Sequence, residues 1–315
     1  MTILRIGTRN SPLALAQARW VSEQIESVSH GGVTCKIVGM TTTGDQLQDR
    51  SLIDAGGKGL FTKELDLALE RREVDLLVHS LKDVPVELPV GQRILAYPQR
   101  EDPRDAFVSL KYKWFSELPE GATVGTSSLR RRAFVLAKRP DLKVVEFRGN
   151  VQTRLRKLED GVADATFLAC AGLRRLGLHD EVGSGMDAKD FLPAVGQGIL
   201  AIAAYPEQLS DDAQRAVREL NHVETERAAI SERAALSELD GSCRTPIAAH
   251  LFHEGAGCYR LMVQTAHPDG TPMYAAEKML EGLELFLQDF RALGHEVGKE
   301  ILAQAGGRLP HLENQ

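Results

Sequence analysis

The sequence predicts an α/β protein: two lobes with mixed, mainly parallel sheets, followed by a small α+β C-terminal domain. Short apolar strands alternate with amphipathic helices, which is the pattern of parallel sheets. The chain has 315 residues, more than the roughly 250–300 at which one hydrophobic core stops growing, so several domains are expected. A late apolar strand at 199–203 follows a glycine-bearing turn and is expected to rejoin the first sheet.

The first lobe is expected to comprise residues 1–98 and 199–217. Apolar spacing predicts, in chain order, a strand, a helix, a strand, a helix and a strand over 4–7, 11–20, 33–40, 61–69 and 74–79. Ser11 is a natural N-cap and Pro12 suits the first helical position, so a helix is expected to begin there. Arg9 lies in the turn before that helix, where its guanidinium and the free helical amides could bind the same anion.

The second lobe is expected to comprise residues 104–192, after a linker at 101–105. Its strands are predicted to begin near residues 105, 123, 142 and 165, each followed by a polar or glycine-bearing turn and a helix. Residues 193–198 form a candidate hinge. Two chain crossings of this kind would place a cleft between the lobes. Charged helices after residue 213 and a strand at 259–264 predict the third, α+β domain over 221–315.

The charge distribution argues against a general nucleic-acid binder and favours a focused anion site. The net charge of the chain is −6. Between residues 124 and 157, however, ten lysines and arginines accompany only two acids, Asp141 and Glu146. An acidic protein with one locally basic segment is typical of a site for a small anionic ligand.

The sequence also argues against a membrane or secreted protein. No stretch approaches about 18 consecutive apolar residues. The N-terminus lacks the basic and apolar regions of a signal peptide. The four cysteines (Cys35, Cys170, Cys243 and Cys258) are widely spaced and form no Cys-x-x-Cys pair. This usage argues against a disulfide framework and favours the reducing cytoplasm.

One cysteine lies in a segment that would present it to solvent. A helix is predicted over 232–239, where Asp240-Gly241-Ser242 would end it and Pro246 would keep it from resuming. Cys243 lies between this breaker and the proline, so its thiol would be accessible for covalent chemistry. The alternative is that Cys243 is a small buried apolar residue, as most free cysteines are.

A carboxylate follows the buried strand at 74–79. Ligands of parallel α/β sheets bind beyond the carboxyl ends of strands, which is where Ser80, Lys82 and Asp83 are expected. Asp83 would be well placed there for proton transfer. The alternative is a solvated Lys82–Asp83 pair of little consequence.

Three strand-end turns of the second lobe carry arginine. They hold Ser127, Ser128, Arg130 and Arg131, then Arg148 and Arg154, and then Arg174 and Arg175. Any one of these arginines alone would most simply be a surface charge. Together, with about 1.5–3 kcal/mol for each charge-assisted contact in a partly desolvated site, they could hold a polycarboxylate.

Other ligand motifs fit poorly. The turn at 56–59 lacks the first glycine and the final hydroxyl of a phosphate-binding loop, and the chain has no Gly-x-Gly-x-x-Gly motif for a dinucleotide. Cys243, His250, His253 and Cys258 have no spacing that is usual for zinc, so no metal site is expected.

Seven motifs resemble those of porphobilinogen deaminases, also called hydroxymethylbilane synthases, and they span nearly the whole chain. They are Arg-Ile-Gly-Thr-Arg-Asn-Ser-Pro-Leu-Ala at 5–14, Gly-Lys-Gly-Leu-Phe-Thr-Lys-Glu at 57–64, His-Ser-Leu-Lys-Asp-Val-Pro at 79–85, Gly-Thr-Ser-Ser-Leu-Arg-Arg at 125–131, Arg-Gly-Asn at 148–150, Ala-Val-Gly-Gln-Gly at 194–198 and Gly-Ser-Cys at 241–243. Several of these motifs are diagnostic alone. The chain differs from several relatives at Asp54-Ala55, where they carry a lysine.

The resemblance implies two lobes like those of periplasmic binding proteins and a third domain that carries a covalent dipyrromethane cofactor on Cys243. The implied reaction joins four molecules of porphobilinogen head to tail with loss of ammonia, and hydrolysis then releases hydroxymethylbilane. The implied protein is a cytoplasmic monomer without nucleic-acid or membrane partners. The competing interpretation is a two-lobed anion- or solute-binding protein, which would leave the presented cysteine unexplained.

The resemblance also implies roles for individual residues. Asp83 resembles the catalytic carboxylate. The residues implied to bind the cofactor are Cys243, Lys58, Ser80, Lys82, Asp83, Ser127, Ser128, Arg130 and Arg131. The residues implied to bind substrate are Arg9, Ser11, Phe61, Arg148, Arg154 and Arg175.

Overall fold

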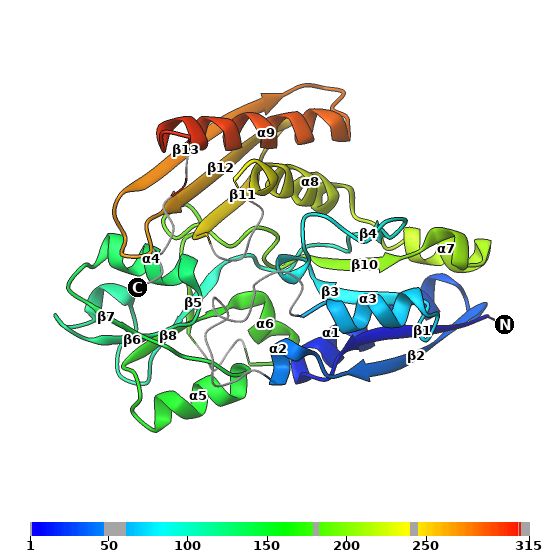
Figure 1. Ribbon diagram of the computed structural model, residues 1–315, viewed down its shortest axis with the longest axis horizontal. Coiled ribbons are helices and arrows are strands. Elements are labelled where there is room, and N and C mark those ends of the chain that lie inside the picture. Colours follow the sequence, from blue (N-terminus) through cyan, green and yellow to red (C-terminus); the bar gives the residue numbers. More distant parts are fainter. Residues whose placement is uncertain (1, 47–60, 179–182, 240–244, 308, 310–315) are drawn as a thin grey trace. The chain divides into compact units, whose positions relative to one another are not determined.

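The computed structural model describes residues 2–46, 61–178, 183–239, 245–307 and 309 (Figure 1). The chain forms two compact units. The first comprises Met1–Glu101 and Gly198–Ala229, and the second comprises Asp102–Gln197 and Ile230–Gln315. The second unit thus includes the segment expected as lobe 2 and the expected C-terminal α+β domain except for residues 221–229, which belong to the first unit. The boundaries of three separate domains stay a prediction.

The first unit is built on a mixed five-stranded sheet in the order β2-β1-β3-β10-β4. Its strands are β1 (Thr2–Arg9), β2 (Val33–Met40), β3 (Leu76–Ser80), β4 (Arg93–Ala96) and β10 (Leu200–Ala204). Strand β1 pairs in parallel with β2 and β3, whereas β10 is antiparallel to both β3 and β4. The prediction that the late apolar strand rejoins the first sheet is therefore confirmed.

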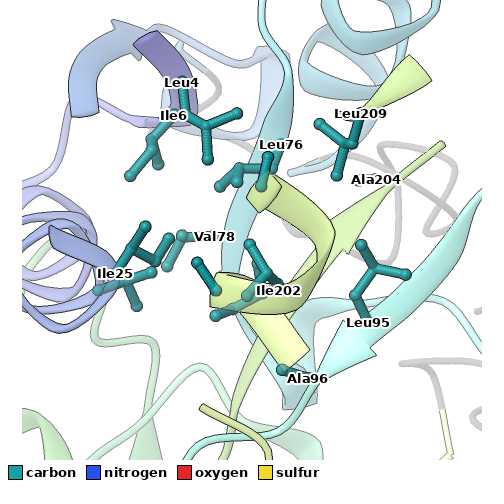
Figure 2. Close-up of a cluster of buried hydrophobic side chains, with 14 of the residues drawn as sticks. Leu4, Ile6, Ile25, Leu76, Val78, Leu95, Ala96, Ile202, Ala204 and Leu209 are labelled. Carbon is teal, nitrogen blue, oxygen red and sulfur yellow. The ribbon is translucent and has the colours of Figure 1, made fainter. Parts of the chain in front are cut away.

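Helices cover both faces of this sheet. Helices α1 (Pro12–Val28) and α7 (Asp211–Arg218) lie on one face, and α3 (Lys63–Glu70) lies on the other. The unit also contains the short helix α2 (Thr43–Gln46) and the 3-10 turns η1 (Leu81–Asp83) and η3 (Pro206–Gln208). Figure 2 shows the core under α1 and α7, where Leu76 and Val78 of β3 pack with Ile202 of β10. The alternate residue Leu77 packs on the opposite face, with Leu65 of α3. This alternation follows from the two-residue period of a strand.

The first helix begins where its sequence predicts and ends later. Ser11 caps α1, because its Oγ accepts a hydrogen bond from the Ala14 amide at 3.2 Å. The helix continues to Val28 rather than ending near residue 20, because Val21 and Ile25 extend the face that the sheet buries. The cap therefore fixes the helix start at the carboxyl end of β1, next to Arg9.

The second unit contains another mixed five-stranded sheet, in the order β7-β6-β8-β5-β9. Its strands are β5 (Asp105–Val108), β6 (Thr123–Gly125), β7 (Lys143–Val145), β8 (Ala165–Ala169) and β9 (Ser184–Gly185). Strand β6 is parallel to β7 and β8, and β5 is antiparallel to β8 and β9. Strand β8 begins where the sequence predicts and ends at Ala169, because α6 begins at Cys170 directly after it.

The helices of this sheet are α4 (Leu129–Lys138), α5 (Val151–Glu159) and α6 (Cys170–Arg175), and η2 (Phe115–Glu117) is a 3-10 turn. On one face, Phe134 of α4 packs with Phe107 and Phe167. On the other face, Leu158 of α5 packs with Leu173 of α6. Helix α4 thus begins at the carboxyl end of β6, which places the predicted arginine-bearing turn on a rigid support.

The C-terminal part of the second unit is an antiparallel sheet of β11 (Ile247–Gly255), β12 (Cys258–Ala266) and β13 (Met273–Glu281). Helix α9 (Leu287–Gln304) lies along β12 and β13 (Figure 1). Helix α8 (Val223–Glu238) carries the chain from the first unit into the second. The predicted strand at 259–264 lies within β12. In the described ranges, no helix is long and apolar enough to cross a membrane.

Candidate active site

A cavity of about 50 Å³ lies in the first unit, at the carboxyl ends of β1 and β3. Five of the predicted site residues line it together: Arg9, Ser11, Phe61, Ser80 and Asp83. The other lining residues are Thr8, Leu13, Ala14, Gln17, Val78 and His79. The carboxyl ends of parallel strands meet at one edge of a sheet, which is why residues far apart in the sequence converge here.

Asp83 is half-buried at the end of η1, and its position is held by backbone hydrogen bonds. The Leu81 amide donates to the Ile199 carbonyl at 2.9 Å, and the Val84 amide donates to the Leu81 carbonyl at 3.0 Å. Within the described part of the chain, no hydrogen bond or ion pair engages the Asp83 carboxylate. Its oxygens are therefore available to a ligand in the cavity.

Arg9 is held by a residue that the sequence did not single out. The Arg9 guanidinium donates two hydrogen bonds to Asp45 and lies 4.3 Å from the centroid of the Phe61 ring. Burial raises the pKa of Asp45, but the hydrogen bonds from Arg9 and Thr42 outweigh it and hold that pKa below its usual value. The one available signal was that Asp45 follows β2, the parallel neighbour of β1.

His79 is a second lining residue that the sequence analysis did not recognise. Its side chain is buried, and burial together with the nearby Arg9 charge lowers its pKa to about 4. The imidazole is therefore neutral at neutral pH. Gln17, another lining residue, donates from Nε2 to Ser80 Oγ at 2.9 Å, which orients the Ser80 hydroxyl in the cavity wall.

In the second unit, one buried carboxylate joins two of the predicted arginines. Asp105 is fully buried. Its Oδ2 accepts from Arg130 at 2.5 Å, and its Oδ1 accepts from Arg131 Nε and Nη2 at 3.1 and 2.6 Å. Gln197, in the predicted hinge, also donates to Asp105, at 3.0 Å. Asp105 was expected at the end of the linker and the start of a strand, but not as a partner of these arginines.

The Arg130–Arg131–Asp105 cluster carries one more positive than negative charge. Arg130 donates to the Leu192 carbonyl at 2.8 Å, and its Nε is buried without a hydrogen-bond partner among the described residues. Arg131 donates to the Phe167 carbonyl at 2.7 Å. A buried guanidinium with an unmatched charge and a free donor favours an anionic ligand.

Further positive charge lies at the start of α5. Asn150 caps this helix, and Arg154 donates to the Gly149 carbonyl at 2.9 Å. Burial, together with the nearby charges of Arg131 and Arg148, lowers the pKa of Arg154 to about 10, although Glu146 acts in the opposite direction. Arg148 is paired with Glu146 at 3.0 Å. The predicted Arg131, Arg148 and Arg154 are thus brought near one another, and their mutual repulsion would be relieved by a bound anion.

The two predicted serines of this unit fix the turn before α4. Ser128 is the N-cap of α4 and accepts from the Arg131 amide at 3.4 Å. Ser127 Oγ accepts from the Phe147 amide at 3.2 Å, which links the turn after β6 to the turn after β7. These hydrogen bonds position the helix start and leave the hydroxyl protons for other acceptors.

The remaining predicted site residues are placed elsewhere or lie outside the described residues. Lys82 is exposed on η1, and Arg175 is half-buried at the end of α6, so neither lines the cavity of the first unit. Cys243 and Lys58 lie outside the described residues. The described part of the cysteine segment includes Glu232, which is fully buried.

Glu232 ties the predicted hinge to the C-terminal sheet. Its Oε2 accepts from the Gly196 amide at 2.8 Å, and its Oε1 accepts from the Leu251 amide at 3.1 Å. These partners lie in the segment 193–198 and in β11. The helix that precedes the cysteine is therefore fixed to both by one carboxylate.

The sequence is similar to a known enzyme family over most of its length. Residues 4–212 match the family model described as porphobilinogen deaminase, dipyromethane cofactor binding domain. The porphobilinogen deaminase of Paracoccus denitrificans (strain Pd 1222) is 46% identical over 306 residues, which cover 96% of this chain and 94% of that protein. The chloroplastic porphobilinogen deaminase of Oryza sativa subsp. japonica is 44% identical over 313 residues, covering 97% and 85%.

The solved structures that this chain matches are more distant in sequence. DctP7, a Bordetella pertussis extracytoplasmic solute receptor binding pyroglutamic acid, has a TM-score of 0.43 at 13% identity and covers 98% of this chain, with 97% of its own chain matched. The methionine-binding protein MetQ has a TM-score of 0.43 at 16% identity, covering 73% and 94%.

Proposed function

Because the chain belongs to the porphobilinogen deaminase family, we propose that the cavity at the carboxyl ends of β1 and β3 is where porphobilinogen is processed. The chain is a transferase of tetrapyrrole biosynthesis that joins four porphobilinogen molecules head to tail and releases hydroxymethylbilane by hydrolysis. The observation that carries the site assignment is the convergence of Asp83, Arg9 and Ser80 in one cavity wall. The carboxylate of Asp83 can bind the aminomethyl pyrrole of the substrate. The guanidinium of Arg9 and the hydroxyl of Ser80 can donate hydrogen bonds to its two carboxylates.

Asp83 is the proposed catalytic carboxylate. In each cycle the carbon–nitrogen bond of the substrate's aminomethyl group breaks and ammonia leaves. A carbon–carbon bond then forms to the free ring position of a second pyrrole, which loses its proton. Positive charge develops on the substrate pyrrole as ammonia leaves, and a carboxylate beside the pyrrole N–H stabilises that charge and orients the ring. The half-buried Asp83, without an ion-pair partner in the described chain, can do both.

The arginines of the second unit fit a dipyrromethane cofactor. This group bears four carboxylates, and the unmatched charge of the Asp105 cluster, the free Arg130 Nε and the lowered pKa of Arg154 all favour such an anion. Arg130, Arg131, Ser127 and Ser128 would hold it, and we propose Cys243 as its covalent attachment. When bound, the cofactor supplies the free pyrrole position to which the first substrate is joined.

The substrate carboxylates are proposed to bind the remaining predicted residues. Arg9, Ser11 and Phe61 line the cavity of the first unit, and Arg148 and Arg154 supply cationic groups in the second. Lys58, Lys82 and Arg175 keep their proposed roles from the family resemblance. A cytoplasmic location is proposed as well, on the cysteine usage of the chain, and a monomer is proposed on the family resemblance. Light scattering of the purified protein tests the oligomeric state.

Intact-mass measurement of the purified protein tests the proposed function. The expected mass exceeds that of the polypeptide by one dipyrromethane group, and the excess is absent from Cys243→Ser. Addition of porphobilinogen is expected to extend the adduct by whole pyrrole units. An unmodified mass in freshly purified protein that turns over porphobilinogen would exclude the covalent cofactor, and a normal adduct in Cys243→Ser would move the attachment to another residue.

A further inference from the structure

Arg9 and Asp45 meet because two parallel strands end side by side. Arg9 is the last residue of β1 and is in register with Met40, the last residue of β2. Asp45 follows five residues later, in the short helix α2. Arg9 donates from Nε to Asp45 Oδ2 at 3.3 Å and from Nη2 to Asp45 Oδ1. The carboxylate thus engages one complete edge of the guanidinium, the bidentate geometry that best fixes its orientation.

The Asp45 carboxylate is itself held in place by its own turn. Asp45 Oδ2 accepts from the Thr42 amide at 3.1 Å and from the Thr42 hydroxyl at 2.8 Å. Thr42 is fully buried. On the other side of the turn, Glu64 of α3 accepts from the Thr43 amide at 3.0 Å and also from the Thr43 hydroxyl. The position of Asp45 is therefore fixed, because Thr42, which precedes α2, and Thr43, the first residue of α2, are both held by hydrogen bonds.

Phe61 restricts the guanidinium in the remaining direction. The Arg9 guanidinium carbon lies over the Phe61 ring, 4.3 Å from its centroid, so the group is in contact with the aromatic face. Nη1 makes no hydrogen bond to any residue in the described ranges. Arg9 lines the cavity, with about a quarter of its side chain exposed. The edge that Asp45 leaves open is thus the part of the guanidinium available to a ligand.

We propose that Asp45 is a positioning residue that, with Phe61, holds Arg9 so that its open edge receives a carboxylate of the incoming porphobilinogen. This inference rests on the proposed function, since porphobilinogen is the ligand. Asp45 itself does not touch the substrate. It acts through Arg9, and it also offsets part of the Arg9 charge, so the site binds a carboxylate by directed hydrogen bonds as well as by charge.

The same strand supplies a matched control. Arg5 of β1 donates from Nε and Nη2 to Asp75 at 3.0 and 2.7 Å, which is the same bidentate arrangement. Burial raises the pKa of Asp75, but the contacts with Arg5 outweigh burial, so the pKa lies below its usual value. The pKa of Asp45 is lowered in the same way by its hydrogen bonds. The exposed fractions of the two aspartates are also alike, 21% for Asp75 and 22% for Asp45. Arg5 does not line the cavity, so Asp75→Asn removes an equivalent ion pair away from the site.

The test compares steady-state turnover of porphobilinogen by the full chain and by Asp45→Asn and Asp75→Asn. Asp45→Asn is expected to raise KM about tenfold with kcat changed by less than about threefold, because binding is lost and the chemical step is not. Asp75→Asn is expected to keep both constants. Asp45→Glu retains the charge but displaces it by one methylene, so a KM between those of the unaltered chain and Asp45→Asn is expected. If Asp45→Asn does not fold, Asp45→Glu takes its place in the comparison.

A double-mutant cycle separates positioning from a general structural role. In an Arg9→Gln background, Asp45→Asn is expected to raise KM no further, since the residue through which it acts is already absent. An equal KM for Asp45→Asn and Asp75→Asn, a lowered KM for Asp45→Asn, or an undiminished effect in the Arg9→Gln background would each overturn the role of Asp45. No turnover by the unaltered chain would instead overturn the proposed function, and this inference with it.

Discussion

Asp105 Oδ1 accepts two hydrogen bonds from the Arg131 guanidinium, at 3.1 and 2.6 Å, where the carboxylate is fully buried. Burial raises the pKa of Asp105, but the charges of Arg130 and Arg131 outweigh it and hold that pKa far below its usual value. One carboxylate thus supports two guanidiniums. Without the Asp105 carboxylate, the buried guanidiniums of Arg130 and Arg131 would keep only their hydrogen bonds to the Leu192 and Phe167 carbonyls.

Asp105→Asn is therefore expected to be strongly destabilising. Removing one member of a buried ion pair costs about 3–5 kcal/mol, because the partner charge is left uncompensated. Asp212→Asn is the control, since Asp212 pairs with Arg215 on the surface, where both side chains are well exposed, and the substitution should cost about 1 kcal/mol or less. Urea denaturation of both variants measures the difference. Equal free energies of unfolding would contradict the structural role of Asp105.

Asp83→Asn is expected to leave folding nearly unchanged and to abolish most turnover. The asparagine amide has nearly the same shape as the carboxylate, and Asp83 has no ion pair to lose in the described chain, so the fold should be kept. The neutral amide cannot stabilise positive charge on the substrate, so turnover should be lost. General acid–base and electrostatic contributions of this kind are worth about 100-fold or more in kcat. Thermal unfolding and porphobilinogen turnover are the two measurements. Turnover within tenfold of the unaltered chain would remove Asp83 from its proposed role.

Arg154→Gln is expected to weaken substrate binding without weakening the fold. The pKa of Arg154 is lowered to about 10 by burial and by neighbouring guanidiniums, so removing its charge relieves repulsion and offsets the loss of its hydrogen bond to Gly149. The free energy of unfolding should change by less than about 1 kcal/mol, while KM rises about tenfold or more. Arg156→Gln, an exposed position on the same helix, should change neither. A clear loss of stability in Arg154→Gln would argue for a structural role.

The buried His79 gives stability a specific pH dependence. Its pKa is lowered from 6.5 to about 4 in the folded chain, so between these values the unfolded chain binds a proton that the folded chain does not. The effect of His79 on the free energy of unfolding is therefore absent above pH 6.5. As the pH decreases from 6.5 towards 4, this effect lowers the free energy of unfolding by about 3 kcal/mol in total. His79→Gln should remove this component. Urea denaturation at pH 7 and pH 4.5 checks it, and parallel pH profiles for both proteins would contradict it.

The turn between β12 and β13 packs closely against α4. Gly270 has φ +96°, and a Cβ there would lie 2.5 Å from the Ala137 amide nitrogen. Gly255 has nearly the same φ, +94°, with nothing within 4 Å. Both substitutions by alanine carry the same backbone strain, so Gly270→Ala should cost about 1–3 kcal/mol more than Gly255→Ala. Equal costs in thermal unfolding would mean that this turn does not support the helix that carries Arg130 and Arg131.

Much of the fold follows from local sequence patterns. The strand–helix alternation, the Ser11 cap and the return of the apolar segment into the first sheet are each confirmed. The ends of elements were less predictable: α1 runs to Val28, and β8 ends where α6 begins. An end depends on where packing against the sheet ceases, which the local pattern records only weakly.

The positions of site residues at strand ends were predictable for a related reason. Parallel strands bring their carboxyl ends to one edge, so Arg9, Ser80 and Asp83 were expected near a ligand from their order in the chain alone. Cys243, the residue most clearly marked by its own segment, lies outside the described residues, and its role stays a prediction.

The sequence by itself thus determined which residue types stand at the strand ends, and the tertiary structure alone decided their partners. Asp45 with Arg9 is a pair 36 positions apart, and Asp105 with Arg131 is a pair 26 apart. The neutral state of His79 likewise depends on burial and on the nearby Arg9 charge. The buried faces can be predicted from local sequence because the apolar pattern of a strand or helix repeats every few residues. Ion pairing between distant residues depends on strand register and helix placement, which no local spacing encodes.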